Sequence, residues 1–176
     1  MKEILKNIKD MLLDFILKYN FIISTIINII ILVIFYKEIE NYFSESKTDI
    51  LNMIISISGT IFGFILTFLS IFIVFRTEEK YKKNSENENE PTIMLINNDS
   101  FDNIYQLFIR SSYSLGLLLI VSIIYYFTTY GLNHILNSIF IVIIFELIIL
   151  CIIRVSLSVY TFNILIEILI QKNNKE

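Results

Sequence analysis

The stretch ILNMIISISGTIFGFILTFLSIFIVF, residues 50–75, carries no charged side chain and is long enough to cross a lipid bilayer as one helix. About 20 mainly apolar residues suffice, because each helical residue advances ~1.5 Å across a hydrocarbon core ~30 Å thick. Isoleucine favours strands in water, but in lipid only helices or closed barrels satisfy the backbone, and this run lacks the alternation of a barrel. The stretch therefore predicts a transmembrane α-helix.

Three further apolar stretches lie at residues 21–36, at residues 112–130 and from about residue 135 onward. Together the four predict an all-α integral membrane protein with four transmembrane helices. The composition agrees, since 55% of the 176 residues are hydrophobic and 18% are charged, against roughly 25% charged residues in soluble domains. A net charge of −3 leaves no excess of cations for a phosphate backbone, so no direct nucleic-acid binding is expected.

Lysine and arginine near the spans predict the orientation, because positive residues are retained on the cytoplasmic side. The N-terminal segment, the segment between the second and third spans and the C-terminus carry eleven of them, whereas the opposite side has only Lys37 and Lys47. Both termini are therefore expected in the cytoplasm. Absence of Ala and Trp beside abundant Ile, Asn and Lys suggests an AT-rich bacterial genome, which places the chain in a bacterial inner (cytoplasmic) membrane.

The chain divides into four predicted regions. Residues 1–20 have an apolar and a charged face, which is typical of an amphipathic interfacial helix. Residues 21–75 form the first transmembrane hairpin, and residues 76–111 form a cytoplasmic segment with a polar, flexible stretch, KKNSENENEPT, and a helix capped by Asp99 or Ser100. Residues 112–176 form the second hairpin, whose last helix is expected to extend into the cytoplasm beyond Arg154.

Small and polar residues of the 50–75 stretch fall within about 100° of a helical wheel, with only Ser58 opposite. Two of them form the GxxxG step GTIFG, which allows close approach of another helix. Two interpretations stay open: the face packs against another span of the same chain, or it forms a homo-oligomer contact or lines a pore. The residues of this stripe are Ser56, Gly59, Thr60, Gly63, Thr67 and Ser70.

Glu146 lies in the middle of IFIVIIFELIILCIIR, where a charged side chain costs about 2.5–3.5 kcal/mol on insertion scales. Counted from the interfaces, Asn28, Ser122 and Glu146 come to nearly the same depth, which predicts a midplane polar cluster. Either Glu146 is protonated and holds helices together, or it serves ion or proton conduction. Arg154 is rotated too far from Glu146 for an intrahelical pair, so we expect it at the inner interface or in a salt bridge between subunits.

No catalytic or metal site is expected. His134, the only histidine, is predicted in a short outer loop and has no second histidine or paired cysteine to complete a zinc site. Cys151 lies in an apolar run and is expected to be a small buried side chain. Sequence patterns of hydrolases and phosphate-binding loops do not occur, so we expect neither an enzyme nor a cofactor.

The pattern ISISGTIFGFILTFLSIFIVF, residues 55–75, followed by a charged segment and a second helical pair, resembles small four-pass membrane proteins of bacterial anti-phage operons. These include the membrane component of the Kiwa system and four-pass accessory proteins of CRISPR systems. The resemblance implies a homo-oligomer that senses infection or recruits a cytoplasmic effector. Such an effector would dock on residues 76–111 and 155–176; membrane lipids are the other expected partner. The alternatives are a homo-oligomeric ion channel or pore and, third, a holin-like lysis protein.

Overall fold

The structure, a computed structural model, describes residues 2–82, 99–128 and 133–173. These residues form three helices: α1, Lys2–Lys82; α3, Asp99–Phe127; and α4, His134–Asn173. There is no strand in these three ranges, so the predicted all-α class is confirmed for them. Each helix contains a segment long and apolar enough to cross a membrane, within Lys18–Ile71, Tyr105–Phe127 and His134–Asn163.

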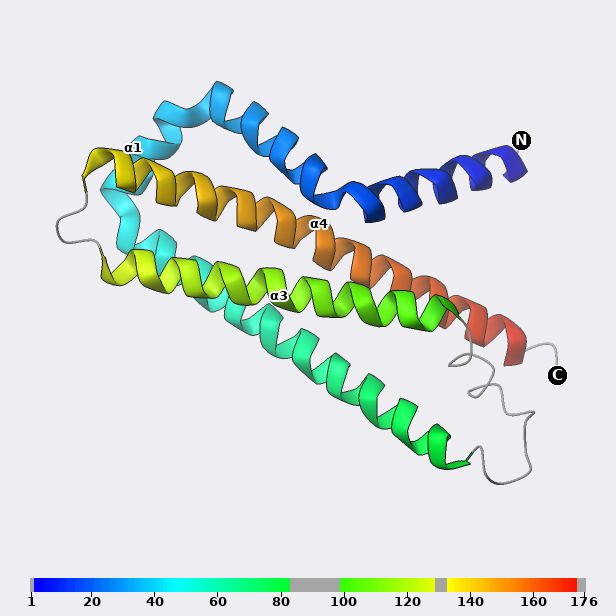
Figure 1. The fold of residues 1–176 in the computed structure, drawn as a ribbon. Helices are drawn as coiled ribbons and strands as arrows, with labels where there is room; N and C mark the ends of the chain where they lie inside the picture. The colour runs from blue at the N-terminus through cyan, green and yellow to red at the C-terminus, as the bar shows by residue number, and fades with distance from the viewer. Residues whose placement is uncertain (1, 83–98, 129–132, 174–176) are drawn as a thin grey trace.

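α1 is not a single rod, because Tyr19 and Ser46 have non-helical backbone angles. We call residues 20–45 the first arm and residues 47–82 the second arm. Beyond Ser46 the chain runs back toward the end at which α1 began (Figure 1). Four separate helices were expected, but the connecting residues 37–49 are themselves helical. They contain no Gly or Pro to stop the helix, so the chain reverses at one residue instead of through an open loop.

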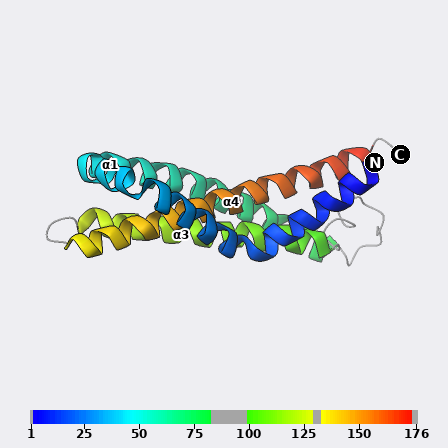
Figure 2. The same cartoon turned by 90° about the horizontal axis from the view of Figure 1, so that it is seen from above.

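The two ends of the molecule differ in what they contain. The start of α1, the end of its second arm, the start of α3 and the end of α4 lie at one end in both views (Figure 2). The bend at Ser46 and the α3–α4 junction lie at the other end. We call these the terminal end and the bend end. The polar stretch KKNSENENEPT falls almost entirely outside the described residues.

Within the described residues α3 begins at Asp99, one of the two residues proposed as its cap, and it continues without a break into the apolar segment. α4 likewise continues to Asn173, which is 173 − 154 = 19 residues past Arg154. At ~1.5 Å per residue this part of α4 is about 28 Å long. The charged and apolar faces predicted for residues 1–20 involve side chains that, for the most part, lie outside the described part of the chain.

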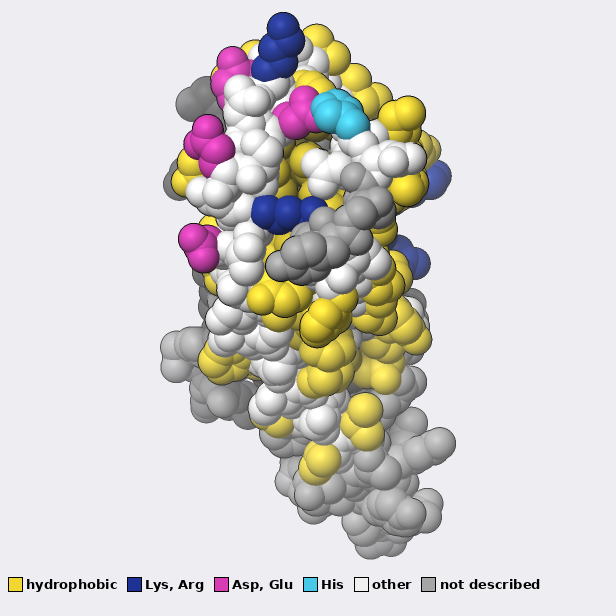
Figure 3. All heavy atoms as spheres, turned by 90° about the vertical axis from the view of Figure 1, so that its left-hand side faces the viewer, with side chains coloured by type: hydrophobic (Ala, Val, Ile, Leu, Met, Phe, Trp, Pro, Cys, Tyr) yellow, Lys and Arg dark blue, Asp and Glu magenta, His cyan; other side chains and the backbone are white. Residues whose placement is uncertain are grey.

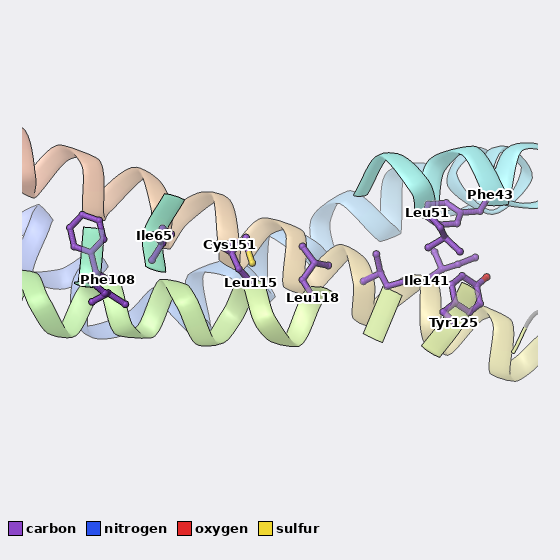
Figure 4. Close-up of a cluster of buried hydrophobic side chains, with 11 residues drawn as sticks. Phe43, Leu51, Ile65, Phe108, Leu115, Leu118, Tyr125, Ile141 and Cys151 are labelled. Atoms are coloured by element: carbon purple, nitrogen blue, oxygen red, sulfur yellow. The ribbon is translucent and has the colours of Figure 1, made fainter. Parts of the chain in front are cut away.

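Apolar side chains from the second arm, α3 and α4, together with Phe43 near the end of the first arm, fill a narrow core along the length of the molecule (Figure 4). Leu51 and Ile65 of the second arm are buried against Leu115 and Leu118 of α3 and Ile141 of α4. Cys151 is 5% exposed, so its predicted burial is confirmed. Serines share the core with these residues, and their small size allows helices to approach closely. Those that are buried are Ser24, Ser58, Ser111, Ser114, Ser122 and Ser158.

Candidate functional site: a polar seam between the first arm and α4

The first arm contacts α4 through polar side chains, although most of its residues are apolar. Asn20, Ser24 and Asn28 follow one another at intervals of four residues, so they share one face of the helix. All three are at most 5% exposed. With Thr25 they face Glu146 and Arg154 on α4, and we call these six residues the polar seam.

Glu146 is bound to the first arm by two hydroxyl groups. Ser24 Oγ donates to Glu146 Oε1 over 2.7 Å, and Thr25 Oγ1 donates to the same oxygen over 3.2 Å. Both hydroxyls also lie within hydrogen-bond distance of the Phe21 carbonyl, at 2.8 and 2.9 Å. One carboxylate oxygen of Glu146 is thus held in place by residues that are adjacent in sequence.

The other side of this contact is short of donors. Asn28 Nδ2 donates weakly to the Val142 carbonyl at 3.5 Å, one helical turn before Glu146. Asn28 Oδ1 and Glu146 Oε2 are buried and have no hydrogen-bond partner in the described part of the chain. Buried oxygens without a donor are costly, each by about 1–3 kcal/mol. Two such acceptors therefore lie one turn apart at the centre of the seam.

Ser122 only partly fits the predicted midplane cluster. It lies on α3, is fully buried, and its hydroxyl has no hydrogen-bond partner within the described ranges. No hydrogen bond therefore joins it to Asn28 or Glu146. Asn28 and Glu146 themselves lie on neighbouring turns where the first arm faces α4, since Asn28 bonds to Val142, one turn before Glu146; their predicted common depth in a membrane stays a prediction.

Arg154 is the seam residue of α4 that lies closest to the terminal end. Its Nε and Nη2 donate to Asn20 Oδ1 over 3.3 and 3.2 Å, and its Nη1 donates to the Arg110 carbonyl over 3.2 Å. One guanidinium group thus connects α1, α3 and α4. Both acceptors are neutral, so these bonds satisfy donors without balancing the positive charge.

A second polar cluster lies at the bend end, where charged side chains gather (Figure 3). Glu40 Oε1 lies 3.0 Å from His134 Nε2 and 3.4 Å from Ser138 Oγ. His134 was predicted in a loop, but it is the first residue of α4, where Glu40 of the first arm meets it. This contact attaches the first arm to α4 at its far end, as the seam does near its beginning.

Lys47 adds the second arm to this cluster. Its Nζ lies 3.2 Å from Asn137 Oδ1 and 3.6 Å from the centre of the Tyr125 ring. Tyr125 is fully buried, donates its hydroxyl to the same Asn137 oxygen and stacks on Phe140 at 5.0 Å. The cation therefore contacts both a carbonyl oxygen and an aromatic face, which together hold the ends of α3 and α4 beside the bend.

The small-residue stripe of the second arm faces away from the rest of the chain. A Cβ atom on Gly63 would meet nothing within 4 Å, and only Gly59, at the edge, approaches α3, with Leu119 Cδ2 at 3.9 Å. The hydroxyls of Thr60, Thr67 and Ser70 donate to carbonyls of their own helix. Within the residues that the structure describes, the stripe therefore does not pack against another span of the same chain. The exposed members are Ser56, Thr60, Gly63, Thr67 and Ser70.

Ser58, the residue opposite the stripe, is instead the buried one, at 3% exposed. Its hydroxyl donates to the Ile54 carbonyl of the same helix. The wheel thus separated the two faces correctly, but the face that contacts α3 and α4 is the apolar one. In a membrane both faces are compatible with helix contact, so the wheel alone did not decide between them.

Sequence reasoning missed Asn20, Ser24 and Thr25. Together these three contribute more hydrogen bonds between the first arm and α4 than Asn28 does. The same wheel argument that revealed the stripe would have found them, because Asn20, Ser24 and Asn28 recur every fourth residue. Glu40 was also missed. Its segment looked like a polar loop, so its position on a helical face was not considered.

The seam presents acceptor oxygens to a buried space and contains one ionisable carboxyl. No group of three or more potential metal-binding His, Cys, Asp or Glu side chains occurs within the described ranges. The arrangement is suited to holding helices together through hydrogen bonds between the first arm and α4. No protein-family model, no curated protein and no solved structure matches this chain.

Proposed function

We propose that this protein is a homo-oligomeric scaffold or sensor of the bacterial inner membrane that recruits a cytoplasmic effector. The two arms of α1, together with α3 and α4, would each cross the bilayer, giving four crossings with both termini in the cytoplasm. The observation that carries the proposal is the exposed small-residue stripe of the second arm, which no other part of the described chain covers.

The shape of this face supports contact with a second copy. On the wheel, Met53, Ile57 and Phe64 lie on one side of the stripe and Leu66 and Ile73 on the other, all of them large and exposed. Small residues between two rows of large ones form a groove, and a helix seated in it gains close van der Waals contact that lipid chains supply less well. The hydroxyls of Thr60, Thr67 and Ser70 already donate to carbonyls of their own helix, so these three make no demand on a partner helix.

The terminal end supports the recruiting part of the proposal. α4 continues for 19 residues beyond Arg154, and α3 begins at Asp99, which is 110 − 99 = 11 residues before Arg110. If these arginines mark the inner interface, both helices extend into the cytoplasm, by about 28 and 16 Å. An effector would dock on this end, on residues 76–111 and 155–176. A role in antiviral defence remains part of the proposal through the resemblance given above.

The oligomer is tested by adding bulk to the groove. We expect Gly63→Ile to convert the oligomer into a monomer in native mass spectrometry of the detergent-purified protein, with the helical content unchanged. Two controls accompany it: Thr60→Val, which keeps the size of the groove residue, and Val33→Leu, which adds bulk at an 80% exposed position of the first arm. An unchanged oligomer in Gly63→Ile would refute the stripe as the contact.

Recruitment is tested separately in cells. A tagged protein encoded beside this gene should move to the membrane fraction with the full chain and stay soluble with a chain truncated after Asn163. Truncation within α4 leaves the seam and the stripe intact. Equal recruitment by both chains would show that residues 164–176 are not part of the docking surface.

A pore is the second candidate function, favoured by the two unpartnered oxygens of Asn28 and Glu146. Because these oxygens lie between the first arm and α4 of one chain, a conduction path would follow the seam and not the stripe. Liposomes containing the purified protein should then leak protons or cations, and Glu146→Gln should stop the leak while keeping the oligomer. Sealed liposomes with the unmodified protein would exclude this function.

A further inference from the structure

The guanidinium of Arg154 lacks a counter-charge among the side chains that the structure describes. No carboxylate oxygen of these side chains lies within 4.0 Å of it, since their one ion pair joins His134 and Glu40 at the bend end. Its three hydrogen bonds go to an amide oxygen and a backbone carbonyl. Of the five N–H groups of an arginine, one on each Nη is left over. Arg154 thus has both charge and donors to spare.

Two further cations belong to the same level of the molecule. Arg110 is exposed on α3. Its backbone carbonyl accepts the hydrogen bond from Arg154 Nη1, and this bond is exposed. Lys18 is exposed on α1, two residues before the Asn20 that holds Arg154, and its Nζ lies 5.4 Å from the centre of the Tyr19 ring. Three helices therefore contribute one cation each.

The position of Arg154 along α4 indicates how deep these cations lie in the membrane. Arg154 is 154 − 146 = 8 residues from Glu146, or about 12 Å along the helix, and half of a hydrocarbon core is ~15 Å. If Glu146 is near the midplane, the backbone of Arg154 lies ~3 Å inside the edge of the hydrocarbon core, and its long side chain can reach the lipid phosphates just outside that edge. The surface next to these cations, on the side toward Glu146, is apolar. Phe21, Tyr113 and Leu117 are each more than half exposed there.

We propose that Lys18, Arg110 and Arg154 form a binding site for the phosphate of an anionic phospholipid, whose acyl chains lie on the adjoining apolar surface. This inference rests on the membrane location in the proposed function, but not on the oligomer. Arginine is suited to this role because its planar fork donates two parallel bonds to phosphate oxygens. A phosphate would balance the Arg154 charge that Asn20 and the Arg110 carbonyl leave unbalanced.

The site also explains the break in α1 at Tyr19. The residues before the break belong to the segment predicted to lie in the interface, and those after it belong to the first arm. A headgroup held between Lys18 and Arg154 would contact both sides of this break. The lipid would thereby fix the direction in which the first arm leaves the interface.

Binding is tested with the purified full chain and vesicles or added lipid of defined composition. We expect phosphatidylglycerol to bind more tightly than phosphatidylcholine in native mass spectrometry. The double variant Lys18→Gln, Arg110→Gln should weaken phosphatidylglycerol binding by about 25-fold, at about fivefold for each charge. Both side chains are exposed, so the variant keeps the seam, and Lys37→Gln, an exposed lysine of the first arm, is the matched control.

Three results would overturn the proposal. The first is equal binding of phosphatidylglycerol by the double variant and the unmodified chain. The second is equal binding of phosphatidylglycerol and phosphatidylcholine by the unmodified chain. The third is displacement of the lipid by an equal concentration of inorganic phosphate, which would indicate a site for soluble phosphate. The oligomer is read from the same spectra: Gly63→Ile should keep the lipid and lose the oligomer, so the two proposals fail independently.

Discussion

The two arms of α1 bury opposite kinds of residue. The first arm turns Asn20, Ser24 and Asn28 toward α4 and exposes most of its large apolar side chains, of which Val33 is 80% exposed. The second arm turns Leu51 and Ile65 inward and exposes the stripe that contains Gly63, with Ser58 as its one buried serine. The difference teaches that apolarity does not decide which face of these helices is covered.

The physical reason is the solvent that we propose for these helices. In water a helix buries its apolar face, because removing that surface from water is favourable. In lipid the chains are as apolar as leucine, so hydrogen bonds and close packing decide which faces meet. The first arm is held mainly by hydrogen bonds and the second mainly by packing, so a single substitution can weaken each of these attachments.

The largest effect is expected at the first arm. Ser24→Leu places a large side chain at a fully buried position and removes the 2.7 Å bond to Glu146. Overpacking and the lost bond together should lower the free energy of unfolding by about 2–4 kcal/mol. The measurement is SDS-induced unfolding in mixed micelles.

Ser44→Leu is the matched control for this substitution. Ser44 is an exposed serine of the same arm, and its hydroxyl donates to the Asn41 carbonyl of its own helix. If Ser24→Leu destabilised the protein no more than Ser44→Leu, the first arm would not be attached through the seam.

A smaller effect is expected where the second arm packs against α3. A Cβ on Gly116 would already be in van der Waals contact with the Phe62 ring at 3.7 Å, so the further carbons of Gly116→Leu crowd that ring, at an expected cost of about 1–3 kcal/mol. Gly63→Leu meets no atom of the same chain and should leave the stability of the monomer unchanged. The same unfolding measurement in dilute detergent compares the two, and equal losses would contradict the outward orientation of the stripe.

The smallest effect is expected at Asn28. Asn28→Leu gives up one weak bond of 3.5 Å and removes a buried oxygen without a partner, so stability should stay the same or rise by up to about 1 kcal/mol. Asn20→Leu, which removes the acceptor of two bonds from Arg154, should be clearly destabilising. Equal losses of stability in the two variants would indicate that Asn28 Oδ1 accepts a hydrogen bond. The carboxyl group of Glu146 would then be the first donor to examine.

Particular residues show how far sequence reasoning reached. The face that contains Gly59 and Gly63 was identified correctly, because a helical wheel depends only on the order of residues. Its direction was not identified, since that depends on where α3 and α4 lie. Asn28 and Glu146 were predicted at one depth and lie on neighbouring turns where the first arm faces α4, but Ser122, predicted with them, makes no hydrogen bond to either.

The same limit applies to the ends of the helices. Residues 37–49 separate two predicted spans because charge and hydropathy change there, yet they contain no Gly or Pro, and the helix is interrupted only at Ser46. His134 was read as part of a loop for the same reason, although it begins α4 and contacts Glu40. Composition shows where an apolar segment ends. The helix itself can continue further, because backbone hydrogen bonds do not depend on apolar side chains.

Sequence by itself determined that the chain is helical, that long apolar segments are available to cross a membrane, and that Glu146 requires partners, because these properties follow from local composition and length. Tertiary structure alone decided which face each helix covers, that Ser24 and Thr25 are those partners, and that Arg154 joins three helices. These outcomes depend on groups between 44 and 134 residues apart in the sequence, whose meeting is governed by the fit of whole helices.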